Sequence, residues 1–293
     1  MLSFHEQYER YRCTAEELLQ KAVGGMPCGT QLLKDSIAYS LLAGGKRIRP
    51  VLFLAAADAL GIDYRQASDF AVALECIHTY SLIHDDLPAM DNDDYRRGKP
   101  SNHKVFGEGH AILAGDGLLS YAFELLITQC AKGEKYINAA KTLSAAAGIQ
   151  GMVAGQSADL SYSGNAEGKF GKDELLRLQQ DKTAKLIAAP LVMAANLAGK
   201  YEAEFEEFGL LLGSLFQITD DILDVIGESQ AMGKTLGKDE KSGKLTVVSV
   251  LGLEGAQKLA DERYRACLSV LDGIQVDVSF LRELVKNIRE RKK

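Results

Sequence analysis

The chain has 293 residues, of which 46% are hydrophobic and 25% charged, and its 40 acidic against 34 basic residues give a formal charge of −6. These proportions are typical of a globular protein that is long enough to bury a large core. The acidic balance, with a pI near 5.5, excludes a general nucleic-acid binder, which relies on a basic surface, and at face value it argues against an anionic substrate as well.

The first residues, MLSFHEQYERYRC, carry charges where a signal peptide needs an apolar segment, and they are too acidic for a transit peptide. Apolar stretches such as residues 51–57 and 187–198 are interrupted well before the roughly 18 residues that a membrane span requires. The five cysteines are odd in number and form no CxxC pair, as in proteins with reduced thiols. We therefore expect a cytoplasmic protein with no transmembrane segment.

The apolar residues follow helical spacing and only five prolines occur, so the sequence predicts an all-α fold. Segments 69–83, 175–198 and 204–226 are apolar around most of their circumference, as the central helices of a bundle are. Pro190 predicts a kink or a break in the second of them. Loops are expected at four stretches rich in Gly and polar residues: 24–29, 96–109, 161–171 and 227–243. Because none of these is a domain linker, residues 1–293 are predicted to form a single domain, a bundle of roughly ten or more helices around a central cavity.

The segment GGKRIRP at 44–50 places two glycines and three cations directly before an apolar run. Free backbone and clustered cations suit a phosphate group, with an ordinary charged turn as the alternative. It is no Walker A loop, because Lys46 is followed by Arg. GESQAMGKT at 227–235 has one residue too many between its glycines for that motif, which leaves Lys234 as a candidate phosphate ligand.

The first of two aspartate clusters follows an apolar helix and contains Asp85, Asp86 and Asp91. Asp85 and Asp91 are six residues apart, which is poor spacing on a straight helix. Pro88 is expected to end or bend the helix after Leu87, so that Asp91 folds back over the same terminus.

Basic residues flank this first cluster on both sides. Arg96 and Arg97 follow it, and arginine forks suit bidentate phosphate recognition. His78 precedes Asp85 by about two helical turns and so lies on the same face, although a lone helix histidine is more often an ordinary core residue.

The second cluster, Asp220, Asp221 and Asp224, lies within the apolar segment 204–226. Asp220 and Asp224 project from one helix face with Asp221 beside them, so we expect three carboxylates to converge on one spot. Their repulsion must be offset, and Mg²⁺ does so with oxygen ligands and substrate phosphates. Either cluster alone could be a solvated acidic helix end, but two clusters after apolar helices favour metal binding.

Three polar residues, Lys182, Thr183 and Gln217, interrupt apolar helical segments. A buried lysine is costly unless it is paired, which favours a polar cavity inside the bundle. The carboxylates, the cations and the apolar helices together predict a substrate with a charged head and an apolar tail.

At this point the chain resembles the trans-type isoprenyl diphosphate synthases, and among them most closely the bacterial farnesyl diphosphate synthases. The motifs that carry the resemblance appear in the family's order between residues 44 and 239: GGKRIRP, SLIHDDLPAMDNDDYRRGKPSNHKVFGE, AGD at 114–116, GQSADL at 155–160, DKTAKL at 181–186, FQITDDILD and GKTLGKD. The resemblance implies the isoprenoid synthase fold, prenyltransferase activity on small isoprenyl diphosphates, three Mg²⁺ ions per active site and a homodimer.

Site roles carried over by position are likewise implications of the resemblance. The metal ligands would be Asp85, Asp86, Asp91, Asp220, Asp221 and Asp224. The allylic diphosphate would also contact Arg96, Lys182 and Lys234, and isopentenyl diphosphate would contact Lys46, Arg49, His78 and Arg97. Lys182, Thr183 and Gln217 match groups that stabilise the allylic cation. The implied reaction is loss of diphosphate, attack by the isopentenyl double bond and loss of a proton. Asn92 stands where some bacterial relatives have another Asp, which we treat as tolerated.

Product length depends on Tyr80 and the adjacent Ser81. A bulky aromatic five residues before Asp85 tends to close the elongation pocket at fifteen carbons in this family, which favours farnesyl diphosphate made from dimethylallyl or geranyl diphosphate. Geranylgeranyl diphosphate is the alternative product. A class I terpene cyclase, a non-catalytic synthase subunit and a metal-stabilised structural protein are more distant alternatives, because the chain has both aspartate clusters and the full set of cations.

Overall fold

The computed structural model describes residues 2–162, 171–226 and 245–291 of the chain. Among these residues, the regular structure is helical apart from one short β-hairpin, so the predicted all-α fold is confirmed. The chain divides into two compact units, Met1–Ala140 and Lys141–Lys293, each with buried apolar side chains of its own.

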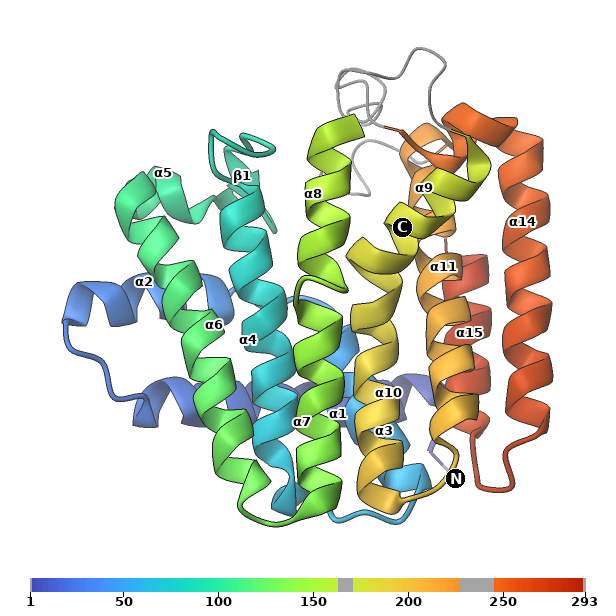
Figure 1. Ribbon diagram of the computed structural model, residues 1–293, viewed down its shortest axis with the longest axis horizontal. Helices are drawn as coiled ribbons and strands as arrows, with labels where there is room; N and C mark the ends of the chain where they lie inside the picture. Colours follow the sequence, from blue (N-terminus) through green and yellow to red (C-terminus); the bar gives the residue numbers. More distant parts are fainter. Residues whose placement is uncertain (1, 163–170, 227–244, 292–293) are drawn as a thin grey trace. The chain divides into compact units, whose positions relative to one another are not determined.

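The first unit is organised around α4 (Ser68–Asp85), which packs most extensively against α6 (Glu108–Cys130); the two helices run side by side in Figure 1. The apolar residues of α4 are buried around the helix, as its sequence predicted, because α1, α2, α3 and α6 all contact it. The remaining elements of this unit are α1 (Phe4–Gly25), α2 (Gln31–Leu41), α3 (Ile48–Ala59), η1 (Tyr64–Gln66), β1 (Tyr95–Arg96), β2 (Lys99–Pro100) and α5 (Asn102–Phe106).

The turn after α4 confirms the expected return of Asp91. The helix ends at Asp85, earlier than the predicted Leu87, and the backbone N–H of Asp91 donates to the carbonyl of Asp85 at 2.8 Å. Asn92 completes the turn with a φ of 51°, a left-handed conformation in which Asn is enriched.

The segment 96–109, expected to be a loop, instead contains the end of a hairpin and the short helix α5. In the hairpin Tyr95 pairs with Pro100 and Arg96 with Lys99. The two residues at its tip, Arg97 and Gly98, have φ values of 53° and 75°, as a two-residue turn between twisted strands requires. Strands this short leave no alternating pattern in the sequence.

The second unit is organised around α11 (Glu202–Ile226), which packs mainly against α10 (Lys185–Ala198) and α14 (Val247–Asp272) (Figure 1). Helix α7 (Glu134–Ala147) spans the boundary between the units. The remaining elements are α8 (Met152–Tyr162), α9 (Lys172–Gln179), the π-helix η2 (Gln180–Ala184) and α15 (Ser279–Glu290).

Of the two outcomes predicted at Pro190, a kink or a break, the break does not occur. Helix α10 continues through this buried proline, which removes only the helical hydrogen bond that its own nitrogen would have donated. The helical path changes earlier, at η2, where one wider π turn joins α9 to α10. Such turns occur frequently at functional sites, and η2 contains two of the residues singled out from the sequence, Lys182 and Thr183.

Two further expectations concern cysteines and membrane spans. All five cysteines are described and all are free thiols. Among the described residues, α6 is the one helix with the length and hydropathy of a membrane span, which the sequence reading did not anticipate; a third of that window (33%) is buried. Length and composition alone do not distinguish a span from the core helix of a globular protein.

Close backbone contact holds α11 against its neighbours in the second unit. A Cβ placed on Gly213 would lie 2.4 Å from the Cα of Ala184, and one on Gly209 would lie 2.5 Å from the Cα of Ala188. These neighbouring atoms are backbone, which cannot move aside as the end of a flexible side chain can.

Gly213→Ala is therefore expected to lower the free energy of unfolding by about 1–3 kcal/mol, because the added methyl group overpacks the contact between α11 and η2. Gly109→Ala is the matched control, since Gly109 lies in α6 with nothing within 4 Å of its Cβ position. The control is expected to be neutral or stabilising by up to about 1 kcal/mol. Equal denaturant midpoints for the two variants would contradict this packing argument.

Candidate functional site

In the first unit, the loop before α3 is held in left-handed backbone conformations. Gly44, Gly45 and Arg47 have φ values of 79°, 119° and 50°. A Cβ on Gly45 would lie 2.9 Å from the guanidinium carbon of Arg97, and Arg97 donates a hydrogen bond to the carbonyl of Gly44. The glycine pair therefore admits the Arg97 guanidinium against the backbone.

The three cations of this loop have different environments. Arg47 is buried and bonds to Glu16 at 2.8 Å, to Glu75 at 2.6 Å and to the carbonyl of Leu41 at 2.8 Å. It is therefore part of the fold and is unavailable to a phosphate. Lys46 is exposed and Arg49 is partly buried, so these two predicted binding residues can be reached by a ligand.

Of the other predicted phosphate ligands, Arg96 and Arg97 lie near His78 in the same unit. The positive charges that act on its imidazole are those of Arg49, Arg97, Arg96 and Arg47. Glu75 and Glu16 are the carboxylates that offset charge on Arg47 and Arg97, and Glu75 does so for Arg49. Within the described residues, the Nε of Arg49 is buried and finds no hydrogen-bond partner.

The pKa values of these groups are lowered first by burial and further by neighbouring positive charges. Burial lowers the pKa of Arg49 to about 10, and burial also lowers the pKa of Arg97, with the charges of Arg47 and Arg96 adding to the effect. The pKa of His78 falls well below 6.5 for the same two reasons, burial first and the arginines second. An anion bound among these groups would offset the neighbouring positive charges and so raise the lowered pKa values.

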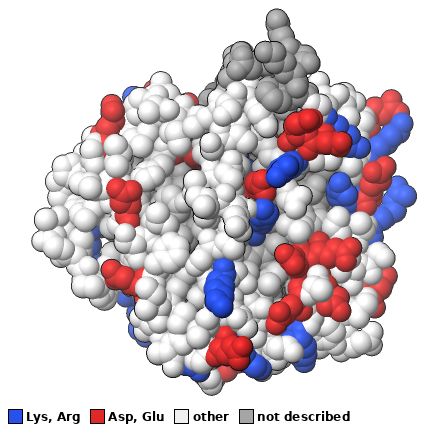
Figure 2. Space-filling view, viewed as in Figure 1, with Lys and Arg blue, Asp and Glu red and all other residues white. Residues whose placement is uncertain are grey.

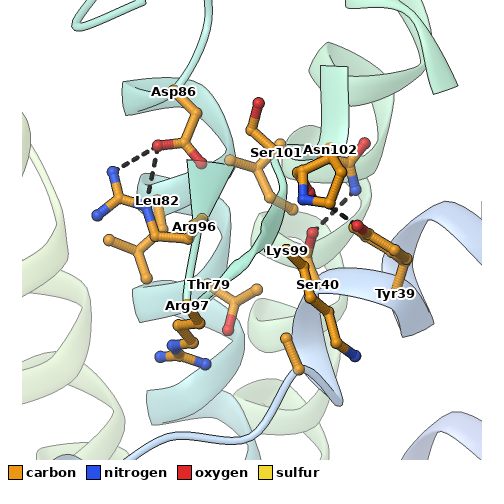
Figure 3. Close-up of a pocket in the computed structure, with 13 residues that line it drawn as sticks. Tyr39, Ser40, Thr79, Leu82, Asp86, Arg96, Arg97, Lys99, Ser101 and Asn102 are labelled. Carbon is orange, nitrogen blue, oxygen red and sulfur yellow. Dashed lines mark hydrogen bonds and ion pairs between the residues drawn. The ribbon is translucent and has the colours of Figure 1, made fainter. Parts of the chain in front are cut away.

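Contacts with α2 fix the position of the hairpin that carries Arg96 and Arg97 (Figure 3). Tyr39 donates its hydroxyl hydrogen to the carbonyl of Pro100 at 2.7 Å, and the amide of Asn102 donates to the hydroxyl of Ser40 at 2.9 Å. Pro100 ends β2 and Asn102 begins α5, so both contacts follow Arg97 closely in the chain. These contacts close a small cavity whose lining includes Asp86, Arg96 and Arg97.

The three aspartates of the first cluster differ in exposure. Asp86 is 2% exposed and accepts two hydrogen bonds from Arg96, of which that from Nε is 2.9 Å long. Burial nevertheless raises the pKa of Asp86. Asp85 is partly exposed and Asp91 is exposed at the turn. A ligand in solution can therefore reach Asp85 and Asp91 more readily than Asp86.

Tyr80 and Ser81 lie on α4 just before this cluster. Tyr80 is 6% exposed, and its ring meets that of His84 edge to face at 5.8 Å. Ser81 donates to the carbonyl of His78. A Cβ on Gly115 would lie 2.1 Å from Nε2 of His84, which explains the glycine in the AGD segment.

In the second unit, the neighbouring carboxylates Asp220 and Asp221 have separate partners. Asp220 accepts a 2.6 Å hydrogen bond from Arg291, whose guanidinium also lies 4.4 Å from the ring centre of Phe216. Asp221 is 4% exposed and is bonded inside the protein by Gln179 and Gln217. Asp221 is thus held by protein donors, while Asp220 pairs with Arg291.

The predicted cation-stabilising residues are brought close together around η2. Thr183 donates to Oε1 of Gln217 at 3.2 Å, and Lys182 forms an ion pair with the buried Asp159 of α8. Gly155 permits this arrangement, because a Cβ there would lie 2.2 Å from the backbone nitrogen of Lys182. Lys234 lies outside the described residues.

The aspartates fit a hard divalent cation by their chemistry. They supply carboxylate oxygens, and Asp220 already pairs with a cationic group, Arg291. Among the described residues, no three His, Cys, Asp or Glu side chains lie close enough together to hold a metal ion by themselves. Substrate phosphate oxygens commonly complete a Mg²⁺ site, so a sparse protein ligand set is compatible with Mg²⁺.

Several residues of the site were missed from the sequence: Glu75, Asp159, Gln179 and Arg291. Glu75 could have been found as the one acidic residue within the apolar part of α4, three positions before His78. Asp159 lies in the GQSADL segment, but its pairing with Lys182 depends on tertiary contact. No local sequence pattern indicates that Arg291 contacts α11.

Comparison with known proteins shows the family of the chain. The family model described as "Polyprenyl synthetase" matches residues 30–277. The farnesyl diphosphate synthase of Micrococcus luteus is 44% identical over 264 residues, covering 89% of this chain and 90% of that protein. The chloroplastic heterodimeric geranylgeranyl pyrophosphate synthase large subunit 1 of Arabidopsis thaliana is 44% identical over 276 residues, covering 91% of this chain and 74% of that protein.

Solved structures agree as well. A geranyltransferase from Helicobacter pylori, complexed with magnesium and isoprenyl diphosphate, superposes with a TM-score of 0.82 at 34% identity, covering 98% of this chain and 97% of that chain. A geranyltransferase from Legionella pneumophila gives a TM-score of 0.86 at 32% identity, with the same coverage of the two chains.

The lowered pKa of His78 predicts a pH-dependent stability. Below pH 6.5 the unfolded chain binds a proton at this residue that the folded chain does not, so acid favours unfolding. The loss of unfolding free energy between pH 7 and 5.5 is expected to be about 1 kcal/mol larger for the wild type than for His78→Gln. Parallel stability curves for the two proteins, measured by urea denaturation, would show that His78 is not so perturbed.

Proposed function

Because the chain belongs to the polyprenyl synthetase family and has the all-α isoprenoid synthase fold, we propose that this trans-prenyl diphosphate synthase makes farnesyl diphosphate. It would condense isopentenyl diphosphate with dimethylallyl and then geranyl diphosphate. The observation that carries the proposal is the gathering of Arg49, Arg96 and Arg97 near His78, with the buried Nε of Arg49 left without a hydrogen-bond partner among the described residues.

We assign this cation cluster to isopentenyl diphosphate. Lys46 and Arg49 precede and begin α3, His78 comes from α4, and Arg97 comes from the tip of the hairpin. A diphosphate carries the negative charge that these groups lack, and arginine forks bind its oxygens in bidentate fashion. The unpartnered Nε of Arg49 gives that ligand a donor which no described side chain satisfies.

The two aspartate clusters are proposed to bind the allylic diphosphate through Mg²⁺. Asp85, Asp91, Asp220 and Asp224, which are exposed or partly exposed, would be the ligands. When bound, Mg²⁺ supplies positive charge that stabilises the leaving diphosphate. Arg96 and Lys182 would contact the same diphosphate, and both are held by buried carboxylates, Asp86 and Asp159. Lys234 is proposed for the same role on the resemblance alone.

Thr183 and Gln217 are proposed to face the allylic cation with oxygen atoms. Loss of diphosphate leaves a carbocation, the isopentenyl double bond attacks it, and the released diphosphate takes the proton that the new chain then loses. Oriented oxygens stabilise such a cation without providing a nucleophile, and exclusion of water prevents its hydrolysis.

Product length is proposed to be limited by Tyr80. Its ring is buried on α4 and packed against His84, so the ring cannot turn aside easily to admit a longer chain. The second candidate is a geranylgeranyl diphosphate synthase, which is favoured by the plant relatives named as such, at 44–47% identity.

We further propose a cytoplasmic homodimer. Ile112, Leu113 and Ile127 of α6 are 44%, 55% and 70% exposed, and such a face is suited to burial against a second copy. On the face shown in Figure 2, the basic side chains lie near acidic ones and form no large basic patch.

The proposed function is tested with purified protein, labelled isopentenyl diphosphate and Mg²⁺, using dimethylallyl, geranyl and farnesyl diphosphate separately as primers. Fifteen-carbon product from the first two primers is expected, with activity lost in EDTA and restored by Mg²⁺. No elongation of any primer would overturn the proposal, and efficient extension of farnesyl diphosphate would favour the second candidate.

Tyr80→Ala is expected to lengthen the product beyond fifteen carbons, because removal of the ring opens space beneath the growing chain. Chromatography of the dephosphorylated products measures this directly. Tyr121→Ala is a suitable control, because Tyr121 lies on α6 and no site role is assigned to it. Unchanged fifteen-carbon product from Tyr80→Ala would remove Tyr80 as the limit on chain length.

A further inference from the structure

Asp221 is more deeply buried than Asp220 and Asp224, and several protein donors bond to its carboxylate. Its Oδ1 accepts from Nε2 of Gln217 at 2.9 Å, and its Oδ2 accepts from Nε2 of Gln179 at 3.0 Å and from the backbone N–H of Val247 at 2.8 Å. The residue is 4% exposed. Three protein donors therefore already occupy most of the roughly four acceptor positions of this buried carboxylate, which leaves little of it for a metal ion.

These contacts fix the orientation of the Gln217 amide. An ionised carboxylate only accepts hydrogen bonds, so the atom of Gln217 that faces Asp221 must be the NH₂ nitrogen. The amide oxygen then faces Thr183, whose hydroxyl donates to it at 3.2 Å. One buried carboxylate thus determines which end of the Gln217 amide is presented beside Thr183.

The orientation matters chemically, because a carbocation is stabilised by an oxygen with lone pairs and repelled by an amide NH₂ group. We propose that Asp221 is a positioning residue, which holds the oxygen of Gln217 toward the allylic cation, and that it is not a metal ligand. This inference rests on the proposed function. In the second cluster, Asp220 and Asp224 would then bind the metal, and Asp221 would orient Gln217.

Asp221→Asn is the test. Val247 and Gln179 both donate to Oδ2, so the variant keeps an oxygen on that side and presents its new NH₂ to Gln217. Gln217 must then turn its oxygen toward the new NH₂ and its own NH₂ toward Thr183. We expect kcat to fall about 10²-fold, the loss typical of removing one preorganised electrostatic group. Metal affinity, measured by Mn²⁺ electron paramagnetic resonance with inorganic diphosphate, should match that of the wild type.

Two comparisons separate this role from metal binding and from misfolding. Asp220→Asn should weaken Mn²⁺ binding under the same conditions. The charge-conserving double variant Asp221→Asn/Gln217→Glu should recover much of the lost kcat. Its new carboxylate at position 217 accepts a hydrogen bond from the new amide at position 221 and again presents an oxygen to Thr183. Thermal unfolding checks each protein, and if Asp221→Asn does not fold, the double variant is compared with Gln217→Glu alone.

Loss of Mn²⁺ affinity in Asp221→Asn as large as in Asp220→Asn would overturn the inference, as would an unchanged kcat or no recovery in the double variant. Wild-type turnover is measured first. If the wild type extends no primer, the proposed function fails and the inference with it; if the wild type is active, the variants bear on Asp221 alone.

Discussion

The first unit depends on one constraint, the sharing of a few buried carboxylates among several cations. Glu75 is 1% exposed and faces Arg47 directly, with Arg97 at 3.9 Å, while its own Oε2 has no hydrogen-bond partner among the described residues. Arg47 completes its bonds within the fold, but Arg49, Arg97 and His78 remain short of negative charge. Burial of unbalanced charge is costly, so the fold maintains this arrangement at the expense of stability. The diphosphate proposed to bind here would offset that cost, so the unbalanced positive charge would favour binding.

The two aspartate clusters share a pattern. In each, the second aspartate of the Asp-Asp pair is buried and is bonded by protein donors: Asp86 by Arg96, and Asp221 by Gln217, Gln179 and Val247. The first aspartates, Asp85 and Asp220, are more exposed. A doubled aspartate thus serves two purposes, with one carboxylate available to cations and the next fixing a neighbouring functional group. The acid excess of the whole chain is therefore compatible with a phosphate-bearing substrate.

Much of this architecture was accessible from the sequence, because apolar periodicity reports burial. Helix α4 and the return of Asp91 over its end were predicted from spacing and from Pro88. The hairpin at Tyr95 was missed, because two-residue strands show no alternation of apolar and polar residues. The helix break allowed for at Pro190 does not occur, because a buried helix tolerates the loss of a single hydrogen bond. The residues proposed to bind phosphate were recognised by charge and motif. Their partners were missed: Glu75 left a signal as an acidic residue in an apolar helix, whereas the pairings of Asp159 and Arg291 are tertiary contacts that have no local pattern.

The central claim is that the cations around His78 form an anion site for isopentenyl diphosphate. The most direct measurement is the imidazole pKa of His78 by NMR, assigned with His78→Gln, before and after addition of isopentenyl diphosphate without metal or allylic primer. The account predicts a pKa below 6.5 in the free protein that rises on binding, because the diphosphate offsets the charges of Arg49 and Arg97. A His78 resonance that titrates normally and does not respond to isopentenyl diphosphate would contradict it.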